Sequence, residues 1–199
     1  MSEKRRKFER KGSMRRYKRL FFIVAEGACT EPKYFSVLNR FKSDIHVICT
    51  EGRHDSDPKH LLKKMKTALR KQTLKEGDEA WIVADRDEWP ENDVEKLYEW
   101  SRKSDKFGLV ISNPCFELWL LFHFDPGNDA ATKNQCIAKL RSCCLNYSKN
   151  LERVTITKDM VNTAIERSSQ RELSYPEEKW PRSAGYTTMH KLVKKMLVE

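Results

Sequence analysis

Four short apolar runs, separated by longer segments with helical spacing, constrain the fold of this 199-residue chain most strongly. The runs cover residues 20–25, 45–49, 80–84 and 108–112. They are continuous rather than alternating, which is typical of strands buried on both faces. Strands that alternate with helices favour a parallel sheet with helices on both sides. We therefore predict an α/β fold with a mostly parallel central sheet.

The segments between and after these runs have the apolar spacing of amphipathic helices. Asp57-Pro58 is a typical helix start, with a capping side chain before an early proline. Residues 174–185 contain prolines and are predicted to form a loop. A helical part is thus expected to follow the sheet. The predicted helices cover residues 31–41, 58–71, 90–100, 116–124, 133–147, 158–170 and 187–198.

The net charge of +10 is concentrated at the N-terminus. Residues 1–19 contain ten basic and two acidic residues, so they carry +8 and the other 180 residues carry +2. We predict a flexible tail over residues 1–19 and one domain over residues 20–199. The tail either binds the phosphate backbone of a nucleic acid or is a solvated terminus without a specific partner. Its candidate nucleic-acid-binding residues are Lys4, Arg5, Arg6, Lys7, Arg15, Arg16, Lys18 and Arg19.

Composition indicates a cytoplasmic protein with no membrane partner. The longest apolar runs are about six residues, whereas a membrane-spanning helix needs about 20. No apolar segment follows the basic N-terminus, so we expect no signal peptide. The six cysteines show neither a CxxC pair nor the Cys/His spacing of a zinc site, and we expect reduced thiols.

Acidic residues follow two of the apolar runs directly. Glu26-Gly27 follows the first run, and Asp85-Arg86-Asp87 follows the third. Ligands bind beyond the carboxyl ends of parallel strands, so Glu26, Asp85 and Asp87 are expected to converge there. Converging carboxylates repel one another and take up protons unless a cation such as Mg²⁺ is bound. Either motif alone is also a common turn or cap, but together they predict a site for Mg²⁺ or Mn²⁺.

Glu117 is a further candidate because it lies in an otherwise apolar helical segment. Burial of a glutamate requires a partner, so Glu117 is either a metal ligand or catalytic base, or part of a structural ion pair. Asn113 and Lys33 are candidate phosphate contacts, although Asn-Pro is also an ordinary turn opener. We expect His123 to be a core histidine.

Residues 26–35, EGACTEPKYF, resemble the EGxxTExxYF signature of the RloB-like family. This family comprises bacterial proteins with a Toprim-type domain that occur with restriction and phage-defence loci. The resemblance continues through residues 85–87 and through residues 112–121, SNPCFELWLL, and more loosely into residues 186–193. It covers most of residues 20–198 and leaves out the basic tail.

The resemblance implies a Toprim-like fold and a Mg²⁺-dependent nuclease active in anti-phage defence, of the abortive-infection type. It also implies that Glu26, Asp85 and Asp87 hold metal or act as acid and base. Glu31 would join the metal, although it could also be an acid that faces a helix N-terminus. By analogy, RNA, including tRNA, is expected as the substrate rather than DNA, since growth-arresting defence often disables translation.

Two other classes of function remain open. One is nucleotidyl transfer at the same acidic site, although the sequence has no glycine-rich phosphate loop. The other is a non-catalytic or regulatory partner subunit of a defence ATPase. A partner ATPase and an oligomer are both compatible with the sequence.

Overall fold

The structure is a computed structural model with a five-stranded sheet in the order β2–β1–β3–β4–β5. β1 to β4 are parallel, and β5 pairs antiparallel with β4, so the predicted mostly parallel α/β sheet is confirmed. The strands are β1 (Arg19–Ala25), β2 (Ile45–Thr50), β3 (Glu79–Asp85), β4 (Phe107–Asn113) and β5 (Tyr186–Thr187). The structure describes residues 18–42, 45–50, 57–86, 89–145 and 147–197.

Each helix begins within two residues of its predicted start. Five of them end one to four residues earlier than predicted. After the first and the fourth helix the chain continues in short turns, in which Phe41 N donates to Leu38 O and Phe124 N donates to Leu121 O. None of the helices in the described ranges is long and apolar enough to cross a membrane. The helices are α1 (Thr30–Leu38), α2 (Pro58–Leu69), α3 (Glu91–Ser101), α4 (Phe116–Leu121), α5 (Lys133–Cys143), α6 (Lys158–Glu172) and α7 (Met189–Leu197).

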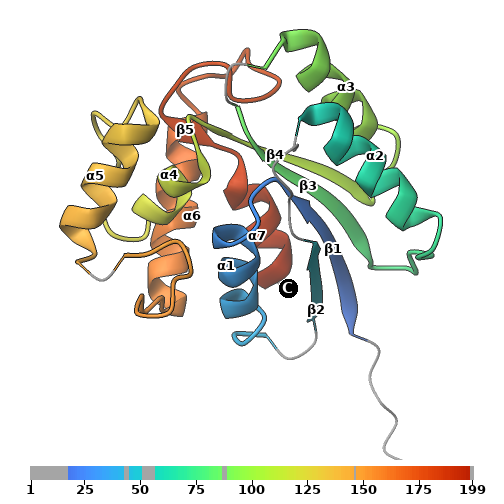
Figure 1. The fold of residues 1–199 in the computed structure, drawn as a ribbon, viewed down its shortest axis with the longest axis horizontal. Helices are drawn as coiled ribbons and strands as arrows, with labels where there is room; N and C mark the ends of the chain where they lie inside the picture. Colours follow the sequence, from blue (N-terminus) through green and yellow to red (C-terminus); the bar gives the residue numbers. More distant parts are fainter. Residues whose placement is uncertain (1–17, 43–44, 51–56, 87–88, 146, 198–199) are drawn as a thin grey trace, which may run out of the picture.

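Helices cover both faces of the sheet. Figure 1 shows α2 and α3 on one face, α1 and α7 on the other, and α4 to α6 grouped beyond β5. Successive residues of a strand point to opposite faces. Thus Phe21 and Ile23 of β1 join the core under α1 and α7, whereas Leu20 and Phe22 join the core under α2 and α3. Burial on both faces explains why β1 is continuously apolar.

Side-chain caps fix the starts of three helices. Asp57 accepts a hydrogen bond from His60 N at 2.8 Å, which confirms the predicted start of α2. Thr132 and Gln135 form a reciprocal capping box at α5, and Thr157 caps α6. These hydrogen bonds hold the start of α5, where Lys133 is the first residue.

The strand β5 was not predicted, because two residues carry no periodic pattern. Residues 187–188 were expected to open the last helix, but α7 begins at Met189. Thr187 lies against Ser112, with their hydroxyl oxygens 2.8 Å apart, and Thr188 N donates to Ile111 O at 3.1 Å. These bonds to β4 outweigh the helical spacing of the following residues.

Candidate acidic site

The carboxyl ends of β1 and β3 lie side by side, as predicted. Ala25 is in register with Val83, and Glu26 N donates to Val83 O at 3.0 Å. The Glu26 side chain then reaches across to β3, where its Oε2 accepts a hydrogen bond from Asp85 N at 2.9 Å. Glu26 and Asp85 therefore share one end of the sheet.

Glu31 turns back from the first turn of α1 toward the same end. It is 6 % exposed, and its Oε1 accepts a hydrogen bond from Gly27 N at 3.1 Å. A Cβ atom at position 27 would lie 2.0 Å from Glu31 Oε2. A side chain at position 27 would therefore displace the Glu31 carboxylate from its present place, a role of Gly27 that the sequence did not reveal.

Glu117 lies in α4, which follows β4 after a cis Asn113-Pro114 bond. The side chain is buried, and its Oε1 accepts a hydrogen bond from the Tyr147 hydroxyl at 3.2 Å. The partner expected for a buried glutamate is thus a neutral phenol rather than a basic residue. Burial and the adjacent Glu117 charge raise the pKa of Tyr147, which keeps the phenol protonated.

The four carboxylates act on one another electrostatically. The pKa of Asp85 is raised well above its usual range, first by burial and then by the charges of Glu26, Glu31 and Glu117. Burial also raises the pKa of Glu31, and the Glu117 charge adds to this shift. Four predicted acids are therefore brought together from four separate segments. The fifth, Asp87, lies outside the described residues.

Lys133 is a basic residue at this site that the sequence did not single out. Its Nζ lies 4.0 Å from Asp85 Oδ2, and its charge lowers the pKa of both Asp85 and Glu31. Lys133 is the first residue of α5, where a positive charge opposes the helix dipole. This unfavourable placement is offset by the negative charge of the acidic site.

Of the two candidate phosphate contacts, Asn113 ends β4 and Lys33 lies in α1. Asn113 Nδ2 donates to the carbonyl oxygens of Pro181 at 3.3 Å and Arg182 at 2.7 Å, so its amide holds the loop before β5. Lys33 is exposed on α1. In the structure, Asn113 therefore has a structural role as a tie between β4 and that loop.

Only two residues of the basic tail, Lys18 and Arg19, fall within the described ranges. Lys18 is exposed at the start of β1. Arg19 begins β1 itself, donates to Lys195 O, and stacks its guanidinium over the Phe21 ring. The other candidates, Lys4, Arg5, Arg6, Lys7, Arg15 and Arg16, lie outside the described residues.

His123 is a buried core histidine, as expected. Its Nδ1 lies 3.0 Å from the Trp119 carbonyl oxygen, which can only accept, so Nδ1 carries the proton. Its Nε2 then accepts from the Tyr34 hydroxyl at 3.2 Å. Burial lowers the pKa of His123 to about 4, so the ring is neutral at pH 7.

The acids suit Mg²⁺ or Mn²⁺ by ligand type, since both are hard cations that take carboxylate oxygens. Within the described ranges, however, no three His, Cys, Asp or Glu side chains are arranged so that they could hold a metal ion. The carboxylates of Glu26 and Glu31 are instead engaged by the backbone N–H groups of Asp85 and Gly27. A complete ligand set would require these side chains to rotate or Asp87 to contribute.

The fold and the site together define an α/β protein with an acidic cluster beyond the carboxyl ends of neighbouring parallel strands. The chain matches the family model described as "RloB-like protein" over residues 21–196, from β1 to α7, and it belongs to this family. The basic tail lies outside the match. No curated protein and no solved structure matches the chain.

Proposed function

We propose that this protein is a Mg²⁺-dependent nuclease with a Toprim-like domain, which hydrolyses phosphodiester bonds of nucleic acid in anti-phage defence. The observation that carries the proposal is the concentration of four carboxylates, in which burial first, and then the charges of the other three, raise the pKa of Asp85. Uncompensated buried charge is costly, and a divalent cation is the usual compensation for such a cluster. RNA, including tRNA, is favoured over DNA as the substrate by analogy alone.

In this proposal, Glu26, Asp85 and Asp87 hold Mg²⁺ or Mn²⁺, and Glu31 or Glu117 completes the site. The bound ion would supply Lewis acidity and lower the pKa of a water molecule. Glu117, which accepts a hydrogen bond from the Tyr147 hydroxyl, would accept the proton of that water. Lys133, at the capped start of α5, offsets negative charge on Asp85 and would attract an incoming phosphate.

The test is a cleavage assay on the full chain with tRNA, single-stranded RNA and plasmid DNA, in Mg²⁺, Mn²⁺ or EDTA. Asp85→Asn removes one acid, and Asp105→Asn is the matched control because Asp105 is exposed and far along the chain from the acidic motifs. We expect metal-dependent cleavage by the wild type and the control, and a loss on the order of 100-fold or more in Asp85→Asn.

The proposal fails if no substrate is cleaved in any metal, with the ATPase of a neighbouring locus added. It also fails if Asp85→Asn cleaves as fast as the wild type. Retained partner binding together with no cleavage would favour a non-catalytic subunit instead.

A further inference from the structure

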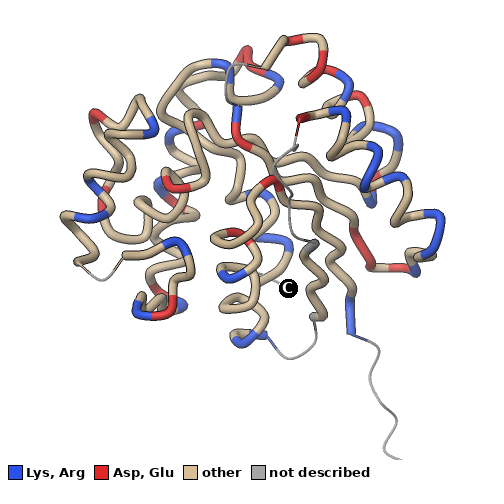
Figure 2. Tube along the Cα trace, in the orientation of Figure 1, with Lys and Arg blue, Asp and Glu red and all other residues tan. Residues whose placement is uncertain are grey.

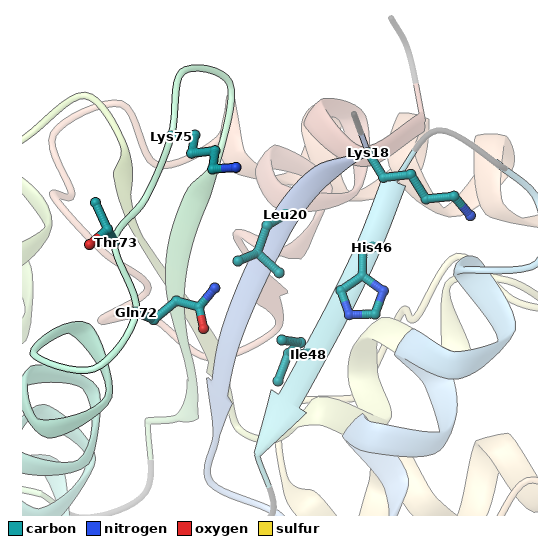
Figure 3. Close-up of a pocket in the computed structure, with 7 residues that line it drawn as sticks. All are labelled: Lys18, Leu20, His46, Ile48, Gln72, Thr73 and Lys75. Atoms are coloured by element: carbon teal, nitrogen blue, oxygen red, sulfur yellow. The ribbon is translucent and has the colours of Figure 1, made fainter. Parts of the chain in front are cut away.

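A groove of about 400 Å³ lies at the opposite end of the sheet from the acidic site. Figure 3 shows its lining on β1, β2 and the loop between α2 and β3. Leu20 and Ile48 form an apolar floor from adjacent strands, with Lys18 and His46 beside them. Gln72 and Lys75 form the facing wall. The groove therefore combines an apolar floor with a polar, basic rim.

The wall of this groove is fixed by a buried carboxylate. Asp78 is 1 % exposed, and its two oxygens accept hydrogen bonds from Leu20 N and Lys75 N, each at 2.8 Å. Lys106 Nζ also donates to Lys75 O at 3.0 Å. The loop is thereby tied both to the start of β1 and to the segment before β4. A ligand would meet a preformed groove and would not have to order the loop.

The charge around the groove is positive. Lys18 and Lys75 are exposed at its rim, and no acidic side chain is among the described residues that line it. Residues 1–17 join the chain at Lys18 and carry a net charge of +6 in the sequence. Alternation along β1 places Lys18 on the groove side with Leu20, whereas Arg19 is held on the opposite face by Lys195 O. An extended, negatively charged partner would be attracted both by the basic rim of the groove and by the basic tail.

We propose that this groove binds one nucleotide of a single-stranded nucleic acid. The base lies on the Leu20 and Ile48 floor beside the His46 ring, and the Gln72 amide hydrogen-bonds to its edge. Lys18 and Lys75 contact the flanking phosphates. Proteins hold single strands with flat side chains, histidine among them, that stack on bases, and with cations that contact the backbone. The β1 strand of seven residues separates this site from Glu26 by roughly 20 Å, so the groove is an anchoring site remote from the acids.

The inference deepens the proposed function, since it names single-stranded nucleic acid as the class of substrate. Binding is therefore measured separately from cleavage, in EDTA and in the Asp85→Asn chain, which leaves the probe intact. The probe is a fluorescent single-stranded RNA of roughly 12 nucleotides, within the usual site sizes of single-strand binders. Fluorescence anisotropy gives the affinity at several salt concentrations.

The Lys18→Ala/Lys75→Ala pair tests the rim, and Lys63→Ala/Lys66→Ala is the control. Lys63 and Lys66 are exposed on α2, so the control removes the same charge elsewhere. We expect the groove pair to weaken binding about tenfold and to reduce the salt slope by roughly 1–2, with a smaller effect of the control pair. His46→Ala/Gln72→Ala should weaken RNA binding without changing the salt slope, because those side chains contact the base.

A second measurement needs no variant. RNA that contains 4-thiouridine is photo-crosslinked to the unmodified chain, and the adducts are mapped by mass spectrometry; we expect them within residues 46–48 or 72–75.

The inference is overturned if crosslinks fall only in the tail, or if the groove pair binds as well as the control pair. Equal competition by polyglutamate would assign the groove to an acidic protein instead. Groove binding without cleavage would leave this inference standing and count against the nuclease alone.

Discussion

At the scale of single residues, the acidic site is held together against electrostatic repulsion. Backbone N–H groups restrain the carboxylates of Glu26 and Glu31, and Tyr147 restrains Glu117. Burial and the neighbouring carboxylates together raise the pKa of Asp85 well above its usual value. The folded state thus binds a proton at Asp85 more tightly than the unfolded chain does. An ionised Asp85 therefore destabilises the metal-free fold at neutral pH.

Asp85→Asn is accordingly expected to stabilise the metal-free protein. Removing the unfavourable charge should raise the melting temperature in EDTA by roughly 2–4 °C, equivalent to about 1 kcal/mol. The gain should shrink as the pH falls, because Asp85 then becomes protonated in the wild type. Thermal unfolding at pH 5 and pH 8, with Asp105→Asn as the control, measures this. An unchanged or lower melting temperature at pH 8 would contradict it.

Lys133→Ala is expected to shift the pH dependence of the acidic site. The Lys133 charge lowers the pKa of Asp85 and Glu31, so its loss raises both. The acidic limb of the cleavage profile should then move to higher pH by roughly 0.5–1 unit. The control is Lys139→Ala on the same helix. Equal profiles for wild type and Lys133→Ala would show that Lys133 does not act on these acids.

The acids that follow the strands, and Glu117 in its apolar helix, could be predicted because each stands out against neighbouring residues. Tyr147 and Lys133 could not be predicted. Tyr147 lies 30 residues from Glu117 along the chain, and only the packing of α5 against α4 brings the two segments together. Nothing in the local pattern of either residue marks it.

At the scale of elements, continuous apolar runs identified the four parallel strands. Both faces of β1 and β3 and most of β4 are buried, whereas β2, at the edge of the sheet, is only partly covered. How side chains of neighbouring strands pack against one another is visible only in the structure. Gly108 of β4 lies in register with Trp81 of β3, and a Cβ atom at Gly108 would lie 2.4 Å from the Trp81 ring. The indole is also fixed by a hydrogen bond from its Nε1 to Glu79 Oε2 at 3.0 Å.

Gly108→Ala should therefore destabilise the protein by about 1–3 kcal/mol through overpacking. Chemical denaturation measures the change in the free energy of unfolding. In the double variant Gly108→Ala/Trp81→Phe, the smaller ring should recover part of the loss, which a double-mutant cycle detects. Strictly additive effects would argue against a clash between these two residues.

The pairing of α6 with α7 depends on a buried histidine. His190 Nε2 lies 3.1 Å from Glu172 Oε2, and Lys191 Nζ lies 2.6 Å from Glu172 Oε1. The hydrogen bond with His190 is the largest cause that lowers the pKa of Glu172, to about 2. Because the folded pKa is depressed, this contribution to stability is present above about pH 4.5 and is lost as the pH falls toward 2.

Glu172→Gln should lower the free energy of unfolding at pH 7, since the buried His190 loses a charged partner. The difference from the wild type should narrow as the pH falls from 4.5. Urea denaturation across this range measures it, and Glu166→Gln, an exposed change on α6, is the control. A pH-independent difference would show that the ionisation of Glu172 is not involved.

At the scale of the whole molecule, the parallel sheet gives the protein two chemically different ends. The acids gather beyond the carboxyl ends of the strands, and the groove with Lys18 lies at the amino ends. Charge is unevenly spread over the helices, since α2, α5 and α7 contain basic residues and no acidic ones (Figure 2). The α/β class could be predicted from the alternation of strands and helices. The groove could not, because three distant segments line it.

The basic tail should govern the salt dependence of nucleic-acid binding without contributing to folding. Because Arg19 belongs to β1, the informative deletion removes residues 1–17, which carry a net charge of +6. We expect a smaller slope of log affinity against log salt concentration and an unchanged melting temperature. An unchanged slope would show that the tail makes no phosphate contacts.

The antiparallel strand β5 affects how the chain folds while it is being translated. Thr187 pairs with Ser112, 75 residues earlier, and α7 then covers the sheet. The four acids Glu26, Glu31, Asp85 and Glu117 are all translated well before this partner strand. In the nascent chain, these acidic residues are therefore present before the sheet is complete, while apolar surface of β1 and β4 is still uncovered. Until β5 and α7 are translated, this exposed apolar surface makes the nascent chain prone to aggregation.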